Sequence, residues 1–501
     1  MAQRLRVLLV ASEASPFAKT GGLGDVAAAL PRALRALGHD VRILMPRYRG
    51  VERHASGIRT VVPRLEVPVG DRRVEGALLA TETSADVPVY FLQQDQYFDR
   101  DGLYGTGDGD YPDNCERFVF FCRGALEALL ALDGEGRDAW RPQIIHANDW
   151  QTGLISVYLR TLYRDHPALR AVATVFTIHN LAYQGVFWHH DMPMTGLGWD
   201  VFTPAGLEFY GKLNFLKGGL VFSDLLTTVS RTYAAEIRTA EFGNGLEGVL
   251  EERAQDLHGV VNGIDYEQWN PAKDPALPRS YSPAEPEGKL VCREALRREL
   301  GIDDGPGLLV AMVTRLAEQK GLDLALESLP GMLDAGCRVA LLGSGEASLE
   351  KAWIKAAAPH PGTVAVRIGY DPELASRMYA GADCFLMPSR YEPCGLAQLI
   401  ALRYGAGPVV RRTGGLADTV SEFDPARRTG TGFLFDALSA DALLDAVRRA
   451  AAAFRRPELW GALVKNAMTE DFSWDASARE YAQLYRKVLR PQGARPSRRS
   501  R

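Results

Sequence analysis

The chain begins with the apolar run Leu5-Arg-Val-Leu-Leu-Val-Ala11, continues through the glycine-rich segment Lys19-Thr-Gly-Gly-Leu-Gly-Asp25, and reaches a second apolar run at Val41-Arg-Ile-Leu-Met45. Apolar side chains recur at helical spacing between the last two segments, at Val26, Leu30, Leu34 and Leu37. A short buried strand, a loop, an amphipathic helix and a second strand make a β-α-β unit. The fold therefore begins with two parallel strands.

Further apolar runs repeat this alternation along the chain. Two precede a proline-rich stretch, at Gln143–His146 and Ala173–Ile178. Five follow that stretch, at Leu308–Val313, Val339–Gly343, Thr363–Ile368, Cys384–Pro388 and Pro408–Val410. Strands that alternate with helices predict parallel sheets. We therefore predict an α/β protein with two Rossmann-like, doubly wound domains.

Proline marks two departures from this regular pattern. Pro31 lies inside the first predicted helix and predicts a kink or an early end there. Between Tyr266 and Lys289 five prolines fall in one polar stretch, which neither a helix nor a central strand tolerates. We interpret that stretch as the connection between the domains.

Composition excludes several classes of protein. In the 501 residues, 46% are hydrophobic and 24% are charged, which are ordinary values for a globular protein. Lys and Arg number 58 against 62 Asp and Glu, so the net charge of −4 gives no basic field for nucleic acid. The six cysteines form no Cys-x-x-Cys pair, which favours a reducing compartment without a disulfide framework or structural zinc. With no membrane-length apolar run and no room for a signal peptide before Leu5, we predict a cytoplasmic protein.

The glycine-rich segment predicts an anion site in the first domain. Glycines let backbone amides approach an anion, and the following helix adds partial positive charge. The spacing Gly22-x-Gly24 resembles a dinucleotide fingerprint, but the strand and the glycines are too far apart, and no acidic ribose ligand follows Met45. Lysine is scarce here and arginine is common, so Lys19 among glycines suggests a compact cation for phosphate.

The second domain carries matching chemistry. Arg315-Leu-Ala-Glu-Gln-Lys320-Gly follows the strand Leu308–Val313, at the end where open α/β sheets bind ligands. Glu392-Pro-Cys-Gly395 leads from another strand into a helix expected to start at Gly395. A carboxylate repels phosphate, so Glu392 is expected to face neutral hydroxyl groups, such as those of a sugar.

Taken in order, these motifs resemble those of bacterial glycogen synthases and plant starch synthases, which are retaining glycosyltransferases of the GT-B fold. The resemblance spans almost the whole chain and adds three further motifs, His146-Ala-Asn-Asp-Trp150, Phe176-Thr-Ile-His-Asn-Leu-Ala-Tyr-Gln-Gly185 and Val261-Asn-Gly-Ile-Asp265. It implies two domains that face a deep cleft. It also implies transfer of glucose from ADP-glucose to the non-reducing end of an α-1,4-glucan such as glycogen.

The resemblance implies roles for individual residues. Its catalytic residues would be His179, beside the donor glucose, and Glu392, on the sugar hydroxyls. The ADP-glucose site would consist of Lys19, Gly22, Asp25, Asn262, Arg315, Lys320, Tyr370, Cys394, Gly395 and Leu396, with Asp149 and Asn180 as weaker candidates. Because Lys19, Arg315 and Lys320 would together hold the diphosphate, the resemblance implies that no metal or other cofactor is required.

The resemblance and the proline-rich stretch together predict the domain organisation. We expect an N-terminal domain over residues 1–260, a connection over 261–290 and a nucleotide-sugar domain over 291–473. A helix over 474–490 is expected to return to the first domain, before a disordered basic tail over 491–501. The sequence predicts neither nucleic-acid nor membrane partners, and it leaves the oligomeric state open.

Several alternatives remain at this stage. The chain could be a related GT-B enzyme that uses UDP-glucose, a non-catalytic protein that binds glucan or nucleotide sugar, or a pyridoxal-dependent phosphorylase. His189-His190-Asp191 resembles a metal cluster, but a solvated loop is favoured because nothing at ligand spacing completes it. Asp108-Gly-Asp110 resembles the metal motif of another transferase fold and is interpreted as a surface or acceptor-side loop. Cys394 is interpreted as pocket wall, since glycosyl transfer does not need a thiolate.

Overall fold

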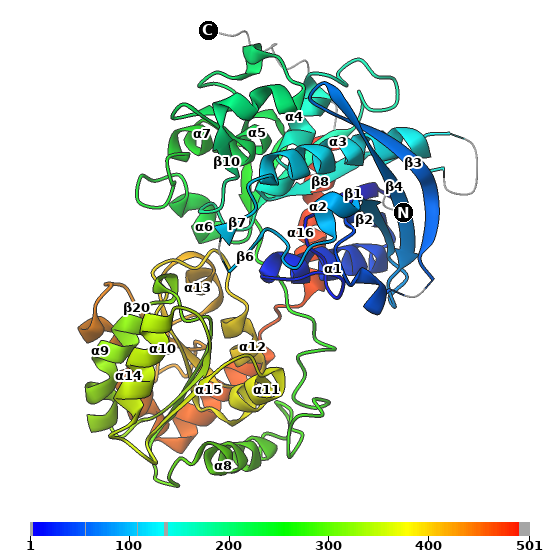
Figure 1. The fold of residues 1–501 in the computed structure, drawn as a ribbon. Helices are drawn as coiled ribbons and strands as arrows, with labels where there is room; N and C mark the ends of the chain where they lie inside the picture. Colours follow the sequence, from blue (N-terminus) through cyan, green and yellow to red (C-terminus); the bar gives the residue numbers. More distant parts are fainter. Residues whose placement is uncertain (1–3, 56, 108, 135–138, 490–501) are drawn as a thin grey trace. The chain divides into compact units, whose positions relative to one another are not determined.

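The computed structural model describes residues 4–55, 57–107, 109–134 and 139–489 and contains two compact units (Figure 1). The first unit comprises residues 1–229, 234–260 and 474–501, and the second comprises residues 230–233 and 261–473. Asp108 and the predicted tail over 491–501 lie outside the described residues. Among the described residues, no helix is both long enough and apolar enough to cross a membrane.

The first unit is built on a nine-stranded sheet in the order β14-β13-β9-β8-β1-β2-β5-β4-β3. The strands from β14 to β5 are parallel, whereas β4 pairs antiparallel with both β5 and β3. In chain order they are β1 (Arg6–Val10), β2 (Asp40–Pro46), β3 (Arg59–Val69), β4 (Arg72–Glu82), β5 (Pro88–Gln93), β8 (Ile144–Asn148), β9 (Ala173–Ile178), β13 (Leu225–Thr228) and β14 (Leu257–Gly259). The antiparallel edge was not predicted, but the parallel core was, and it is confirmed.

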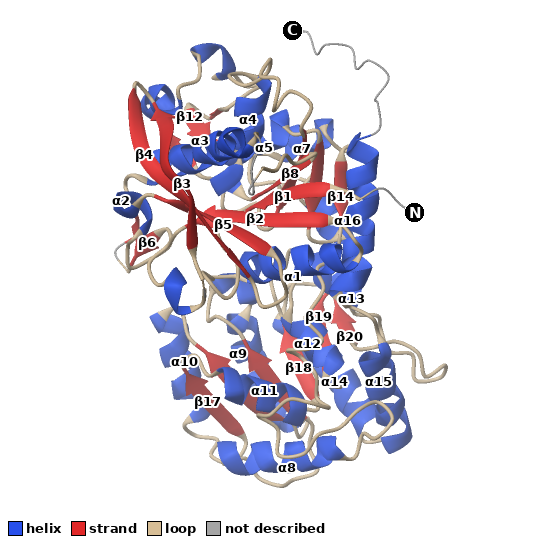
Figure 2. Cartoon of the chain, turned by 90° about the vertical axis from the view of Figure 1, so that its right-hand side faces the viewer, coloured by secondary structure: helices blue, strands red, loops and turns tan. Residues whose placement is uncertain are grey.

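Helices cover both faces of this sheet (Figure 2). On one face α3 (Asn114–Leu132), α4 (Leu154–Arg160) and α5 (Phe215–Phe222) pack against one another, and α1 (Gly22–Ala36) packs against α16 (Trp474–Leu489) on the other. Short helices α2 (Asp95–Phe98), α6 (Arg231–Glu236) and α7 (Glu247–Glu252) and the small strands β6 (Gly105–Thr106), β7 (Gly109–Asp110), β10 (Val186–Trp188), β11 (Glu208–Phe209) and β12 (Lys212–Asn214) lie in the connections.

The first helix differs from its prediction at both points where local rules were applied. It begins at Gly22, so the glycines form its first turn rather than a loop before it. It also continues through Pro31, and the expected early end is wrong. Pro31 is buried on the apolar face with Leu30 and Leu34, and that packing offsets the hydrogen bond that proline cannot donate.

The second unit contains a six-stranded parallel sheet in the order β17-β16-β15-β18-β19-β20. These are β15 (Leu309–Val313), β16 (Arg338–Gly343), β17 (Val364–Ile368), β18 (Cys384–Met387), β19 (Gly407–Arg411) and β20 (Phe433–Phe435). Its helices are α8 (Gly288–Leu300), α9 (Leu322–Asp334), α10 (Ala347–Ala357), α11 (Pro372–Gly381), α12 (Ala397–Arg403), α13 (Gly414–Thr419), α14 (Ala440–Phe454) and α15 (Pro457–Thr469).

Alternate side chains along β15 pack into two different cores, one on each face of the second sheet. Leu308, Val310 and Met312 belong to the core on the side of α9 and α14, whereas Leu309 and Ala311 belong to the core on the side of α8 and α11. Successive side chains point to opposite faces of a strand, so a continuous apolar run indicates burial on both. The second doubly wound sheet is thereby confirmed.

The proline-rich stretch forms no helix or strand between Tyr266 and Glu287 and belongs to the second unit. There the buried Tyr281 donates a hydrogen bond to the carbonyl of Tyr404 (2.9 Å). Near its start Ile264 donates from its backbone to Phe472 (2.9 Å), just before α16. The two segments at which the chain leaves and re-enters the first unit are therefore hydrogen-bonded to each other.

Candidate functional site

Each sheet reverses its winding direction at one place, and the predicted motifs follow the strands on either side of it. In the first unit the reversal lies between β1 and β8, and in the second it lies between β15 and β18. At such a point the connections from two neighbouring parallel strands run to opposite faces of the sheet. They leave a crevice beyond the carboxyl ends of the strands, where open α/β sheets bind ligands.

The glycine segment of the first unit presents one lysine and several uncapped amides. The N-cap of α1 is Gly21, which has no side chain that could cap the amides of the first turn, where Gly22 lies. Lys19 Nζ lies 2.7 Å from Asp25 Oδ1, in an ion pair that is largely exposed. A Cβ on Gly24 would lie 3.1 Å from the side chain of Lys19. The structure therefore brings the predicted residues Lys19 and Asp25 together, in the turn of α1 that begins at Gly22.

Glu13 joins this half-site although the sequence analysis did not select it. Its side chain is 3% exposed, and it accepts hydrogen bonds from the backbone amides of Thr20 (2.6 Å) and Gly21 (3.3 Å). It also accepts from the hydroxyls of Thr20 (2.7 Å) and Tyr104 (2.7 Å). The only hint of this role in the sequence was the position of an acidic residue shortly after a buried strand.

His179 follows β9 and lies beside the ends of β8 and β1. Its Nε2 lies 3.0 Å from Oδ1 of Asn148. The Nδ2 group of Asn148 donates to the carbonyls of Val10 and His146, so Oδ1 must be an acceptor. Nε2 of His179 therefore carries the proton, and Nδ1 keeps its lone pair. Burial lowers the pKa of His179 to about 3, which makes the ring neutral near pH 7.

Asp149 combines an unusual backbone with an unusual carboxyl group. Its φ of 55° and ψ of 179° belong to a region that favours glycine, which indicates local strain. Its backbone amide donates to Thr177 (2.9 Å), and its carboxylate accepts from the backbone amide of His179 (2.7 Å). Burial, with a smaller contribution from the charge of Glu13, raises the pKa of Asp149 to about 7. The weaker candidate Asn180 adjoins this pair and donates from its backbone to Asp149.

In the second unit Lys320 and Glu392 form a largely buried ion pair. Lys320 Nζ lies 2.6 Å from Glu392 Oε2, which also accepts from Ser389 Oγ (3.0 Å). Glu392 therefore does not face hydroxyl groups alone, as the sequence analysis expected, because a cation stands beside it. Arg390 secures this geometry: its backbone amide donates to Gln319 (2.8 Å), and its guanidinium pairs with Asp323 (2.6 Å).

Glycines bring the backbones of this half-site into close approach. Gly321 has a φ of 65°, and a Cβ there would lie 2.0 Å from the carbonyl oxygen of Pro388. Gly414 has a φ of 44°, and its Cβ would lie 2.0 Å from the carbonyl oxygen of Glu392. Gly415 donates from its backbone to that same carbonyl (3.0 Å). Side chains at these positions would displace the segment that carries Glu392.

Other predicted residues of the second unit differ in their surroundings. Asn262 is buried, and its Oδ1 has no hydrogen-bond partner among the described residues. Burial raises the pKa of the Cys394 thiol to about 12, so it is protonated at neutral pH. Tyr370 is 91% exposed, and Arg315 is also exposed.

The helix after Glu392 starts later than expected. Gly395 adopts a φ of 72°, Leu396 is the N-cap, and α12 begins at Ala397. The expected start at Gly395 is therefore wrong, since a left-handed residue cannot begin a right-handed helix. The amides of Gly395 and Leu396 nevertheless lie beside Cys394 and close to Glu392 in sequence.

Two sequence features lie away from these half-sites. His189, His190 and Asp191 begin a short 3-10 helix (His189–Thr195) instead of a loop. Asp110 ends the small strand β7 and is exposed. Within the described ranges, no three His, Cys, Asp or Glu side chains are grouped as metal ligands.

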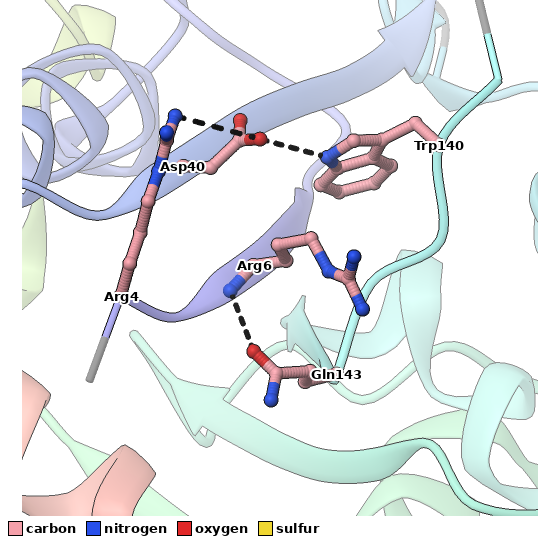
Figure 3. Close-up of a pocket in the computed structure, with 5 residues that line it drawn as sticks. All are labelled: Arg4, Arg6, Asp40, Trp140 and Gln143. Atoms are coloured by element: carbon pink, nitrogen blue, oxygen red, sulfur yellow. Dashed lines mark hydrogen bonds and ion pairs between the residues drawn. The ribbon is translucent and has the colours of Figure 1, made fainter.

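A pocket in the first unit lies at the opposite edge of the sheet, at the amino ends of β1 and β2 (Figure 3). Its lining residues are Arg4, Arg6, Asp40, Trp140 and Gln143. Trp140 Nε1 donates to Asp40 (3.0 Å), and the backbone amide of Arg6 donates to Gln143 (3.0 Å). None of the predicted site residues lines this pocket, so it is not the candidate site.

Comparison with known proteins gives matches over nearly the whole chain. Residues 6–252 match the starch synthase catalytic domain, and residues 293–460 match the glycosyl transferases group 1. The glycogen synthase of Syntrophotalea carbinolica is 50% identical, covering 97% of this chain and 99% of its own. That of Anaeromyxobacter sp. (strain Fw109-5) is 51% identical, covering 97% of this chain and 100% of its own.

Two solved structures resemble the model. The catalytic domain of Starch Synthase IV from Arabidopsis thaliana, bound to ADP and acarbose, has a TM-score of 0.87 and 33% identity, covering 97% of this chain and 100% of its own. A sucrose-phosphate synthase from Thermosynechococcus elongatus has a TM-score of 0.58 and 18% identity, covering 98% and 100%, and shares the fold alone.

The close approach of Gly414 to the carbonyl oxygen of Glu392 predicts that a side chain at this position lowers activity. In Gly414→Ala the added Cβ displaces the backbone at Glu392, and we expect turnover to fall at least about tenfold, which corresponds to ~1.4 kcal/mol in the barrier. Gly461→Ala is the matched control, because its Cβ in α15 meets nothing within 4 Å. Steady-state kinetics and thermal melting of both variants check this, and wild-type turnover in Gly414→Ala would contradict it.

The raised pKa of Asp149 predicts how stability depends on pH. The unfolded carboxyl loses its proton near pH 4, whereas the folded one keeps it until about pH 7, so the folded state binds more protons between those values. Stability of the wild type should therefore fall relative to Asp149→Asn as pH rises from 4 to 7, by up to about 1.4 kcal/mol per pH unit. Urea unfolding across this range measures the difference, and a difference independent of pH would refute the shift.

Proposed function

The chain belongs to the glycogen synthase family of glycosyltransferases, and from this premise we propose that it transfers glucose from ADP-glucose to the non-reducing end of an α-1,4-glucan with retention of configuration. The glycogen synthases at about half identity and the starch synthase structure with bound ADP support this proposal. The glucan acceptor is proposed because these relatives are named as glycogen and starch synthases.

The observation that carries the donor assignment is the ion pair between Lys320 and Glu392 in the second unit. Lys320 is held by Glu392 at the carboxyl end of β15, and Arg315 extends from the same loop. A diphosphate offers Lys320 a second anionic partner, and charge-assisted hydrogen bonds of this kind contribute about 1.5–3 kcal/mol each. We propose that Lys19, Arg315 and Lys320 bind the diphosphate, together with the amides of Gly22, Gly395 and Leu396.

Rate acceleration follows from how the charge changes during the reaction. As the bond to glucose breaks, ADP gains negative charge, and fixed cations then bind it more strongly than they bind the donor. Lys320 turns toward the diphosphate, and the carboxylate of Glu392 becomes available to sugar hydroxyls. The same cations supply this stabilisation without a metal, so we expect EDTA to leave the rate unchanged.

The neutral side chains would orient the glucose. His179 offers an unprotonated Nδ1, and Asn262 offers an unpaired buried Oδ1, so both accept hydrogen bonds from sugar hydroxyls. Asp25 orients Lys19, Asp149 holds the backbone of His179, and Asn180 adjoins it. Tyr370 is assigned to the donor pocket, and Cys394 to its wall.

Retention is assigned to displacement on one face of the sugar. The protonated Cys394 is a poor nucleophile, and the carboxylate of Glu392 is assigned to the sugar hydroxyls rather than to the anomeric carbon. The departing phosphate instead takes the proton from the acceptor hydroxyl as that hydroxyl attacks. A covalent glucosyl adduct on any carboxylate, detected by mass spectrometry, would disprove this route.

The compartment is proposed to be the cytoplasm. All six cysteines are free and buried, as suits a chain kept in reducing conditions.

The decisive experiment compares nucleotide sugars. Purified protein is incubated with glycogen and either ADP-glucose or UDP-glucose, and the extension of glucan chains is measured. Extension chiefly from ADP-glucose supports the proposal. Extension chiefly from UDP-glucose would replace the donor, and no extension from either would favour a binding protein.

Substitutions of the lysines test the diphosphate site. We expect Lys19→Ala and Lys320→Ala each to lower kcat/KM for the donor by about 30-fold, equivalent to ~2 kcal/mol, because each removes one charge-assisted hydrogen bond. Lys351→Ala, on the exposed face of α10, is the matched control and should leave kcat/KM unchanged. Wild-type kinetics in Lys320→Ala would show that the assignment is wrong.

A further inference from the structure

We propose that Glu13 is a positioning residue that joins the glycine segment of the first unit to the loop of residues 99–107, so that this loop controls affinity for the nucleotide. We call residues 99–107 the Tyr104 loop. The inference rests on the proposed function in one respect, namely that the glycine segment binds the nucleotide's phosphates.

Glu13 holds the glycine segment through several hydrogen bonds. Both carboxylate oxygens are used: Oε2 accepts from the backbone amides of Thr20 and Gly21, and Oε1 accepts from the Thr20 hydroxyl. These amides lie just before α1, where a helix has no internal acceptors for its first N–H groups. Glu13 thereby fixes the backbone that leads into the uncapped amides at Gly22 and beyond.

Glu13 also contacts a distant segment of the chain. The Tyr104 hydroxyl donates to Oε1 of Glu13 (2.7 Å), the same oxygen that accepts from Thr20. Ser12 Oγ lies 2.7 Å from that hydroxyl and supplies its second hydrogen bond. Ser12 and Glu13 lie two and three residues after the end of β1 at Val10, so the central strand fixes the position at which the two loops meet.

The Tyr104 loop is itself anchored, so it can transmit a constraint. The buried guanidinium of Arg117 donates to the carbonyl of Tyr97 (2.7 Å), just before the loop, and to that of Leu103 (3.0 Å), within it. Asn114 donates to the carbonyl of Tyr104 (2.9 Å). The Tyr104 ring also packs against Trp150, which adjoins Asp149, at a centroid distance of 6.3 Å.

The consequence is energetic linkage between the two loops. A buried carboxylate needs its full set of donors, since an unpaired buried charge is costly. When the Tyr104 hydroxyl is lost, Glu13 has fewer donors, and its hold on Thr20 and Gly21 changes with them. Loss of Tyr104 should therefore weaken nucleotide binding at the glycine segment, although Tyr104 itself contacts Glu13 and Ser12 rather than that segment.

The test is a double-mutant cycle on ADP binding, measured by calorimetry with Glu13→Gln, Tyr104→Phe and both together. We expect Glu13→Gln to weaken ADP binding at least fivefold and Tyr104→Phe at least threefold. The double variant should be no weaker than Glu13→Gln alone, since both act through one contact. Glu13→Ala should be worse than Glu13→Gln, whose amide oxygen still accepts from Thr20.

The matched control is Tyr111→Phe. Tyr111 follows the same loop and accepts a hydrogen bond from Gly102 through its hydroxyl (3.2 Å), but it makes no hydrogen bond to Glu13. Its ADP affinity should equal that of the wild type. If Glu13 were merely structural, the variants would lower the melting temperature while the folded protein kept its ADP affinity.

Two results would overturn the inference: unchanged ADP affinity in Tyr104→Phe, or independent effects that multiply in the double variant. Failure of the donor assignment gives a different pattern, because the wild type would then bind UDP in preference to ADP. The same cycle measured with UDP would still decide the linkage. A wild type that binds neither nucleotide would refute both proposals.

Discussion

Each parallel sheet of this protein reverses its winding direction once, and that topological constraint determines where its chemistry gathers. In the first unit the reversal brings the segments after β1 and β8 together, with β9 alongside. Glu13, Asp149 and His179 are therefore neighbours although they are far apart in the chain. In the second unit the reversal between β15 and β18 brings Lys320 to Glu392 in the same way.

In both half-sites the lysines are paired with carboxylates, so the chain carries these cations without an overall positive charge. Lys19 pairs with Asp25, and Lys320 pairs with Glu392, within a chain whose net charge is −4. Each lysine already has a carboxylate partner. In the proposed donor site, binding of a diphosphate would therefore exchange one partner of the lysine for another, and the released carboxylate would accept hydrogen bonds from sugar hydroxyls.

The sequence predicted the parts of the fold that local patterns determine. Continuous apolar runs such as Leu308–Val313 predicted strands buried on both faces, and the order of the motifs predicted two doubly wound sheets. The antiparallel strands β3 and β4 were not predicted, because their exposed and buried residues follow no simple alternation. Pro31 was judged by local rules, whereas the helix around it is stabilised by packing against the sheet.

Lys19 and Lys320 were selected for their own chemistry, and their role in binding a diphosphate stays a prediction. Residues whose role depends on tertiary partners could not be selected in this way. Glu13 acts through Thr20 and Tyr104, and Gly414 through a carbonyl of another loop. The strained backbone of Asp149 likewise has no local sequence signal.

The central proposal is that Lys19 and Lys320 each contribute a charge-assisted contact to the bound nucleotide. Titration calorimetry of ADP with the wild type and with the double variant Lys19→Ala/Lys320→Ala tests it most directly. The account predicts that the double variant binds ADP at least a hundredfold more weakly, because two charge-assisted contacts are removed. Equal affinity in the two proteins would contradict it.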